Sequence, residues 1–296
     1  MNEFLPTIHI HFIEDFAKIL RDRLTIAGYE MNPNESPRDI IIKYLNILHR
    51  QIEVKPRIVL QSREFNCPPD HQPVVEKIRR KAESGENLNT YLSDKLLCAD
   101  FCDELLLHWG IHHFHLGKKM DKSGFVKGTW ELLFARITDT HVYFIDVKGH
   151  SSWSDRQLLE IQQKNWPDVM SEFRLKGIVR LQENLSDKQI YRLRNAGVNT
   201  LIQLSDGSVF GNFGFGMTMA GRNTANRNAG AMREYMHWAN RLKEMEEFVK
   251  GQINKMVTEG ISLPPEVHLR LELDGERVLA IDENSDIRCV LGNLNN

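Results

Sequence analysis

Histidines gather in one stretch of the chain, residues 109–150, and imidazole is the side chain best suited to proton transfer near neutral pH. Five of the twelve histidines lie there. The pattern over 111–116 predicts a strand, on which His113 and His115 project from one face and His112 from the other. Two imidazoles so placed could hold a phosphate group or a metal ion, or they could form a packed, hydrogen-bonded sheet edge.

A second set of polar groups follows a strand expected over 141–148. Asp146 and Lys148 lie at its end, and His150 comes directly after it. Polar side chains can converge where an apolar strand ends, next to the preceding histidine strand. We therefore expect one solvent-accessible hollow to be lined by His113, His115, Asp146, Lys148 and His150.

An apolar strand that ends in Asp-x-Lys resembles the second half of the PD-(D/E)xK nuclease motif, with the similarity spanning residues 131–162. The resemblance implies that Asp146 and Glu131 hold a divalent metal such as Mg²⁺, and that Lys148 positions the attacking water. It also implies that Gln162, on the following helix, contacts the substrate. A strand end that carries an aspartate and a lysine by chance is the alternative.

Residues 109–150 also resemble the C-terminal half of RelE/YoeB/HigB-type toxin ribonucleases, where a strand, an acidic turn, a second strand and a final histidine follow one another. Members of that family cleave mRNA without a metal. The resemblance implies that His150 transfers protons and that Lys127, Arg136 and Lys148 bind phosphate.

The spacing of apolar residues predicts an α+β protein with a small mixed or antiparallel sheet around 109–148, flanked by helices. We expect a mainly helical region over 1–91 and a central α+β catalytic domain over 92–176. A C-terminal α+β region over 177–296 would contain a long helix over 232–258 and a terminal β-hairpin with an Asp-Gly turn.

A helix is expected over 92–108, directly before the histidine strand, because Leu96, Leu105 and their neighbours give a broad apolar face. Asp103 would interrupt that face as an ordinary helix residue. Gly110 would stop the helix.

Two further regions carry positive charge. The Gly- and Asn-rich segment 211–230 contains Arg222 and Arg227, which could bind phosphates or belong to a flexible connection. Basic residues over 174–194, including Arg194, could form a nucleic-acid footprint, but acidic neighbours also favour a solvated mixed face.

The composition is that of an ordinary globular protein, with 41% hydrophobic and 26% charged residues among 296. A formal net charge of −2 gives no overall attraction to nucleic acid or membrane, so any nucleic-acid contact needs a local patch. The four cysteines form no CxxC pair, and neither a signal peptide nor a transmembrane stretch is expected. These features favour the cytoplasm and no membrane partner.

The leading hypothesis is a bacterial nuclease, an RNase-like toxin or phage-defence protein, with RNA as the favoured nucleic acid. Its expected catalytic residues are His150, Lys148, Asp146 and His113. Its expected substrate-binding residues are His115, Lys127, Arg136 and Gln162. One alternative is a metal-dependent DNA nuclease with Mg²⁺ at Asp146 and Glu131; another is a non-catalytic immunity or adaptor protein. A protein partner or a second copy would then contact the helix over 232–258.

Overall fold

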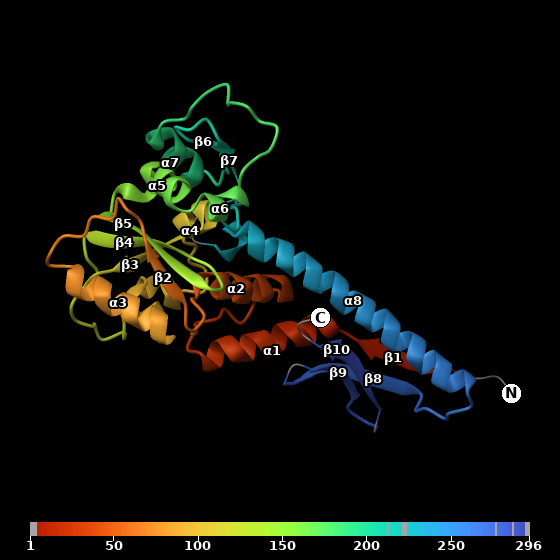
Figure 1. Ribbon diagram of the computed structural model, residues 1–296. Coiled ribbons are helices and arrows are strands. Elements are labelled where there is room, and N and C mark those ends of the chain that lie inside the picture. The colour runs from red at the N-terminus through yellow and green to blue at the C-terminus, as the bar shows by residue number, and fades with distance from the viewer. Residues whose placement is uncertain (1–4, 212, 221–223, 276, 286, 294–296) are drawn as a thin grey trace. The chain divides into compact units, whose positions relative to one another are not determined.

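The chain divides into two compact units in the computed structural model, which describes residues 5–211, 213–220, 224–275, 277–285 and 287–293 (Figure 1). Unit 1 combines Met1–Tyr44 with Met232–Asn296, and unit 2 is the continuous stretch Leu45–Ala231. This grouping differs from the three sections expected from the sequence, because strand pairing joins N-terminal residues to C-terminal ones.

Unit 2 is built on a four-stranded mixed sheet with the strand order β2-β5-β4-β3. β2 (Ile58–Gln61) runs parallel to β5 (His141–Gly149), and β4 (Glu131–Ile137) is antiparallel to both β5 and β3 (Ile111–His115). The expectation of an α+β fold with a small mixed sheet around 109–148 is confirmed.

Short helices and turns surround this sheet. The helices that lie wholly within unit 2 are α3 (Gln72–Ser84), α4 (Glu104–Trp109), α5 (Gln157–Asn165), α6 (Pro167–Ser171) and α7 (Asp187–Asn195). Its 3₁₀ turns are η1 (Asn89–Tyr91), η2 (Asp94–Leu97), η3 (Ser152–Ser154) and η4 (Ala225–Arg227), and β6 (Ile202–Gln203) pairs with β7 (Val209–Phe210).

Both faces of the sheet are buried, as the continuous apolar runs of β4 and β5 predict. One face packs against α3, where Ile78 meets a cluster that includes Phe144. The other face packs against α4 and α5, where Trp109 meets a cluster that includes Phe134 (Figure 1). Side chains at the ends of these strands are therefore held by a densely packed platform.

The prediction of one helix over 92–108 is wrong. The structure has the 3₁₀ turn η2, an irregular stretch, and then the short helix α4. Asp103 is the N-cap of α4, because its Oδ1 accepts hydrogen bonds from the N–H groups of Leu105 and Leu106 at 3.0 and 3.1 Å. Gly110, with a φ of +65°, ends α4 and turns the chain into β3.

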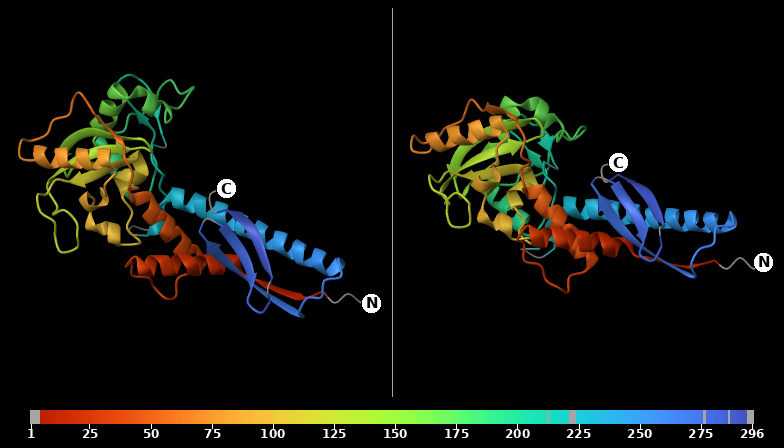
Figure 2. Two further views of the ribbon diagram at one scale, coloured as in Figure 1. Left: turned by 60° about the horizontal axis from the view of Figure 1, so that its bottom comes forward. Right: turned by 90° about the horizontal axis from the view of Figure 1, so that it is seen from below.

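Unit 1 contains a four-stranded sheet with the order β1-β8-β9-β10. β1 (Thr7–Ile10) is parallel to β8 (Glu266–Asp274), and Figure 2 shows the two strands side by side. β8, β9 (Arg277–Asp282) and β10 (Arg288–Asn293) are antiparallel, so the expected terminal hairpin is confirmed.

Three helices contribute to unit 1: α1 (Phe12–Ile26), the first part of α2 (Pro37–Arg50), and most of α8 (Ala229–Thr258), the expected long C-terminal helix. The backbone N–H of Phe12 donates to Glu246 at 2.8 Å, and the N–H of Leu271 donates to Asp15 at 2.9 Å. α1 is thereby fixed both to α8 and to β8. Of the helices in the described ranges, none combines the length and apolar character needed to span a bilayer.

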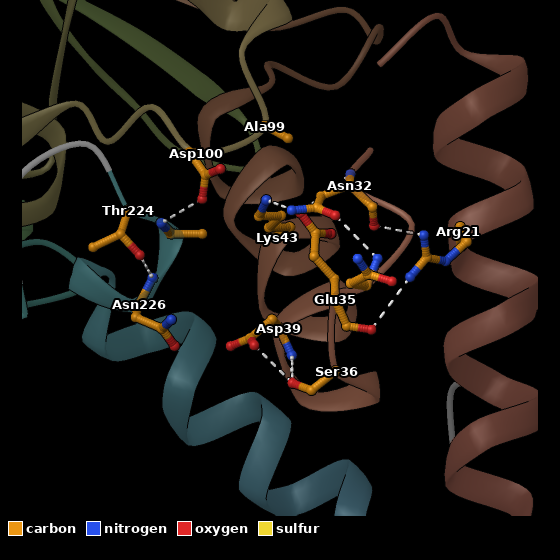
Figure 3. A network of polar contacts seen from close by, with 12 residues as sticks. Arg21, Asn32, Glu35, Ser36, Asp39, Lys43, Ala99, Asp100, Thr224 and Asn226 are labelled. Carbon is orange, nitrogen blue, oxygen red and sulfur yellow. Dashed lines mark hydrogen bonds and ion pairs between the residues drawn. The ribbon is translucent and has the colours of Figure 1, made fainter. Parts of the chain in front are cut away.

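Polar side chains fix irregular segments within each unit (Figure 3). In unit 1, Arg21 of α1 donates to the carbonyl oxygens of Asn32 and Glu35 at 2.8 and 3.3 Å. In unit 2, Asp100 accepts a hydrogen bond from the backbone N–H of Ala225 at 3.3 Å. The second contact ties the irregular stretch before α4 to the turn η4.

Replacing Gly110 with alanine is expected to lower the free energy of unfolding by about 2 kcal/mol or more. A Cβ at this position would lie 2.5 Å from the carbonyl oxygen of Phe213 and 2.8 Å from Nη1 of Arg136. Gly124→Ala is the matched control, since Gly124 has a φ of +83° and no atom within 4 Å of its Cβ position. Urea unfolding should show a loss of about 1 kcal/mol for the control. Equal losses in the two variants would contradict the steric explanation.

Candidate functional site

A cavity of about 390 Å³ in unit 2 brings three of the predicted histidines together: His113, His115 and His150. We call it the imidazole cavity. The other residues that line it are Ser93, Lys95, Phe101, Cys102, Asp103, Glu104, Leu105, Trp153, Tyr191, Arg194, Asn195 and Arg227.

Strand geometry explains why the three imidazoles meet. His113 and His115 share one face of β3, as their spacing predicts. His150 follows the last residue of β5, and the turn η3 then places Trp153 between the imidazoles. The indole ring meets His113 edge-on at 4.4 Å and His150 edge-on at 5.0 Å between ring centroids.

The carboxylate of Asp103 lies beside the His113 ring. Oδ2 of Asp103 lies 3.3 Å from Nδ1 of His113, within ion-pair distance although outside hydrogen-bond geometry. The carboxylate favours a proton on Nδ1, which leaves the lone pair of the neutral ring on Nε2. His113 therefore has the arrangement of a general base held by an acidic residue.

His115 and His150 have the opposite tautomer. Nδ1 of His115 accepts a hydrogen bond from the backbone N–H of Thr129 at 3.2 Å. Nδ1 of His150 accepts one from the indole N–H of Trp153 at 3.3 Å. Because a backbone amide and an indole can only donate, each neutral ring carries its proton on Nε2. Both rings are thus hydrogen-bond donors, so these contacts do not favour the proton-transfer role expected for His150.

Burial keeps two of these imidazoles neutral at pH 7. Burial lowers the pKa of His113, against the opposing effect of Asp103, and His150 and Lys95 lower it further. Burial, together with His113 and His150, lowers the pKa of His115 to about 4. A neutral His113 is ready to accept a proton at physiological pH.

Two buried arginines supply positive charge to the same cavity. Arg194 is 1% exposed and Arg227 is 2% exposed. Nη2 of Arg194 and Nε of Arg227 have no hydrogen-bond partner among the described residues. The other nitrogens of both groups have protein partners, including an ion pair between Arg227 and Glu104 at 3.3 Å. A partly unpaired buried guanidinium group that lines a cavity can hold an anion such as a phosphate. Arg222, the other expected phosphate ligand, lies outside the described residues.

A buried histidine fixes the position of Arg194. Nδ1 of His108 accepts a hydrogen bond from Nε of Arg194 at 3.0 Å. On the other side of the ring, Nε2 of His108 is hydrogen-bonded to Oγ1 of Thr200 at 3.1 Å. Burial, with a smaller effect from Arg194, lowers the pKa of His108 to about 3, so the ring stays a neutral acceptor. The guanidinium also stacks over Trp109 at 4.5 Å.

Asp146 and Lys148 do not line the imidazole cavity. Oδ1 of Asp146 accepts a hydrogen bond at 2.9 Å from the backbone N–H of Asn66, in the loop after β2. β2 adjoins β5 on the side away from β3. Nζ of Lys148 lies 2.9 Å from Asp155 and 2.6 Å from Gln157. The expected single hollow therefore contains the three histidines without this Asp-Lys pair.

Arg136 and Gln162 are buried together, contrary to the expected substrate-binding role. Nε of Arg136 donates to Oε1 of Gln162 at 2.6 Å, and its Nη2 donates to the carbonyl oxygen of Trp109 at 2.6 Å. Gln162 is 1% exposed, and its amide group donates to the carbonyl oxygen of Leu158. The pair holds α5 and the end of α4 to the sheet. Lys127 is exposed and is not among the residues that line the imidazole cavity.

The expected metal ligands Glu131 and Asp146 lie apart on the sheet. Glu131 is opposite Gly149, three residues along β5 from Asp146, which corresponds to about 10 Å. The carboxylate of Glu131 lies 3.4 Å from Nε2 of His71, and burial raises the pKa of Asp146. Neither acid belongs to a possible three-residue metal site among the described residues.

Four features of the cavity were not predicted from the sequence: Asp103, Trp153, Tyr191 and the inward position of Arg194. A usable signal for Asp103 was present, because an aspartate before Glu-Leu-Leu-Leu is a common helix N-cap. Arg194 had no such signal, since nothing in the local pattern distinguishes it from exposed basic neighbours.

Acid is expected to destabilise the protein through its buried histidines. Burial lowers the pKa of His112 to about 4, and neither of its ring nitrogens has a partner among the described residues. The unfolded chain binds a proton near pH 6.5, so stability is present above that pH and is lost as the pH falls toward 4. His112 alone should contribute about 3 kcal/mol to this loss.

Urea unfolding from pH 7.5 to 4.5 measures the effect, with His112→Leu as the test variant. The leucine variant should show a shallower pH dependence than the wild type, whereas His237→Gln, at an exposed position on α8, should not. An unchanged slope in His112→Leu would rule out this histidine as the acid-sensitive group.

Comparison with known proteins adds no family to this description. The chain matches no protein-family model, no curated protein and no solved structure. Its chemistry must therefore be inferred from the side chains that line the imidazole cavity.

Proposed function

We propose that the chain is a metal-independent ribonuclease that cleaves RNA phosphodiester bonds in the imidazole cavity. The observation that carries the proposal is the combination, in one cavity, of an acid-oriented neutral imidazole, two imidazole donors and buried guanidinium groups. Cleavage of a phosphodiester needs these groups: a base for the attacking hydroxyl and donors for the negative charge on the non-bridging phosphoryl oxygens.

The tautomers of the three imidazoles determine which part each is proposed to play in RNA cleavage. Nε2 of His113 takes the proton of the ribose 2′-hydroxyl, whose oxygen attacks the adjacent phosphorus. The Nε2–H groups of His115 and His150, together with Arg194, donate to the phosphoryl oxygens. The bond from phosphorus to the 5′-oxygen breaks, and the hydroxyl of Tyr191 supplies a proton to that oxygen. The imidazolium of His113 then returns its proton to Tyr191 through solvent.

The internal nucleophile favours RNA over DNA. A 2′-hydroxyl is already adjacent to the phosphorus, so attack needs no separately bound water. Cleavage would leave a 2′,3′-cyclic phosphate. The resemblance of residues 109–150 to toxin ribonucleases favours a toxin or phage-defence role in the bacterial cytoplasm.

Replacing His113 with alanine is expected to lower kcat on a single-stranded RNA by about 10²–10⁴-fold, because the general base is lost. Asp103→Asn should also lower kcat, since the ring loses the carboxylate that fixes its tautomer. His141→Ala is the matched control: His141 is a histidine of β5 outside the cavity and should retain wild-type activity. The measurement is single-turnover cleavage of labelled RNA with and without EDTA.

Three outcomes would count against the proposal. If His113→Ala cleaved RNA as fast as His141→Ala, His113 would not be the general base. Loss of wild-type cleavage in EDTA would contradict the metal-independent mechanism. Absence of cleavage of both RNA and DNA would favour a non-catalytic adaptor protein.

The pH dependence of kcat/KM should report the lowered pKa of His113. Activity is expected to fall with acid only below pH 6.5, the ordinary value for histidine, as His113 becomes protonated. Lys95→Met removes a positive charge that lowers this pKa, so the acidic limb should move to higher pH. Lys122→Met, in an exposed loop outside the cavity, is the control and should leave the limb in place. An identical limb in Lys95→Met and wild type would contradict the assignment to His113.

A further inference from the structure

A second group of chemically active side chains lies in unit 1, on its β-sheet. His9 of β1 and His268 of β8 are register partners in the parallel pair, and Thr7 and Glu266 are the partners two residues earlier. Residues two apart on a strand share a face, so Glu266 projects on the same side as the two histidines. The imidazole rings stack at 4.3 Å between centroids with an interplanar angle of 6°.

The donor atoms of these three side chains are close and incompletely paired. The possible ligand atoms of His9, Glu266 and His268 all lie within 4.8 Å of one another. Nε2 of His268 lies 3.2 Å from Oε2 of Glu266. Nε2 of His9 is buried and has no hydrogen-bond partner among the described residues. A buried unpaired imidazole nitrogen next to a second imidazole and a carboxylate is a donor set that suits a ligand able to accept lone pairs.

The adjoining surface favours a cation. A cavity of about 640 Å³ extends from His9 and His268 between α1 and β8. Its charged lining contains more acidic than basic side chains: Glu14, Asp15, Asp22, Glu272 and Glu283 against Lys18 and Arg270. Nε of Arg270 lies 2.7 Å from Glu283, which neutralises part of the positive charge.

We propose that His9, His268 and Glu266 bind one divalent transition metal of the zinc class. Two imidazoles and one carboxylate are a ligand set that Zn²⁺ accepts, and the fourth position would remain open to water from the cavity. Nitrogens that share a tetrahedral zinc are about 3.4 Å apart, given bond lengths of about 2.1 Å. The stacked rings must tilt from their parallel arrangement so that their in-plane lone pairs converge on the ion.

The site has a structural consequence within unit 1. β1 and β8 come from the two ends of the sequence, and the metal would link them through side chains as well as through backbone hydrogen bonds. A metal that binds the folded sheet and not the separated strands stabilises the folded state by mass action.

Titration of the purified, metal-free protein with Zn²⁺ tests the proposal. We expect one equivalent bound per chain, a rise in the thermal midpoint with excess Zn²⁺, and a tetrahedral absorption spectrum with Co²⁺. His268→Gln and Glu266→Gln should each weaken binding at least about 10-fold, because each removes one ligand. His237→Gln, an exposed histidine of the same unit, should bind like the wild type.

His115→Ala separates this site from the imidazole cavity, and it should also bind like the wild type. Circular dichroism of each variant without metal confirms that it is folded. The proposal would be overturned if the wild-type protein bound no zinc. It would also be overturned if His268→Gln bound zinc with unchanged affinity and stoichiometry. Loss of binding in His115→Ala with retention in His268→Gln would place the metal in the imidazole cavity instead.

Discussion

One carboxylate connects the local backbone to the chemistry of the cavity. Oδ1 of Asp103 caps α4, and Oδ2 of the same group lies beside His113 on β3. The cap fixes where the irregular stretch ends and the helix begins, and it places the second oxygen of the same carboxylate beside the ring. Helix initiation and imidazole orientation therefore depend on the same side chain.

Two buried arginines connect the helices around the imidazole cavity. Arg136 joins α5 to the end of α4, and Arg194 joins α7 to α4 through the neutral imidazole of His108. Burial lowers the pKa of each of these two arginines to about 10, so both remain charged at neutral pH. The difference between them lies in their unpaired atoms. Nη2 of Arg194, a residue that lines the cavity, has no hydrogen-bond partner among the described residues, whereas Arg136 directs its guanidinium group to protein oxygens.

The sequence allowed the strands and the histidine set to be predicted, because both follow from short-range patterns. Alternation places His113 and His115 on one face, and a continuous apolar run identifies β5 as a buried strand that ends before His150. The Asp-x-Lys pair was a less reliable guide. Its position along the strand is correct, but the orientation of Asp146 toward the loop after β2 depends on parallel pairing across 80 residues of sequence separation.

The remaining parts of the site depend on tertiary contacts that no local pattern encodes. Arg194 belongs to a helix with a strongly polar sequence, and only packing against Trp109 and His108 makes it buried. Asp103 is the exception, because an aspartate before Glu-Leu-Leu-Leu is itself an N-cap signal. The leucines on either side of Asp103 also fit one continuous helical period, and this competing pattern conceals the start of α4.

The division of the chain has a consequence for the order in which it can fold during synthesis. Unit 2 is one continuous segment, so all of its strands have left the ribosome before β8 has been made. β1, by contrast, must wait for a partner that is translated more than 250 residues later. The sheet of unit 1 is therefore completed last, after every residue that lines the imidazole cavity has been synthesised.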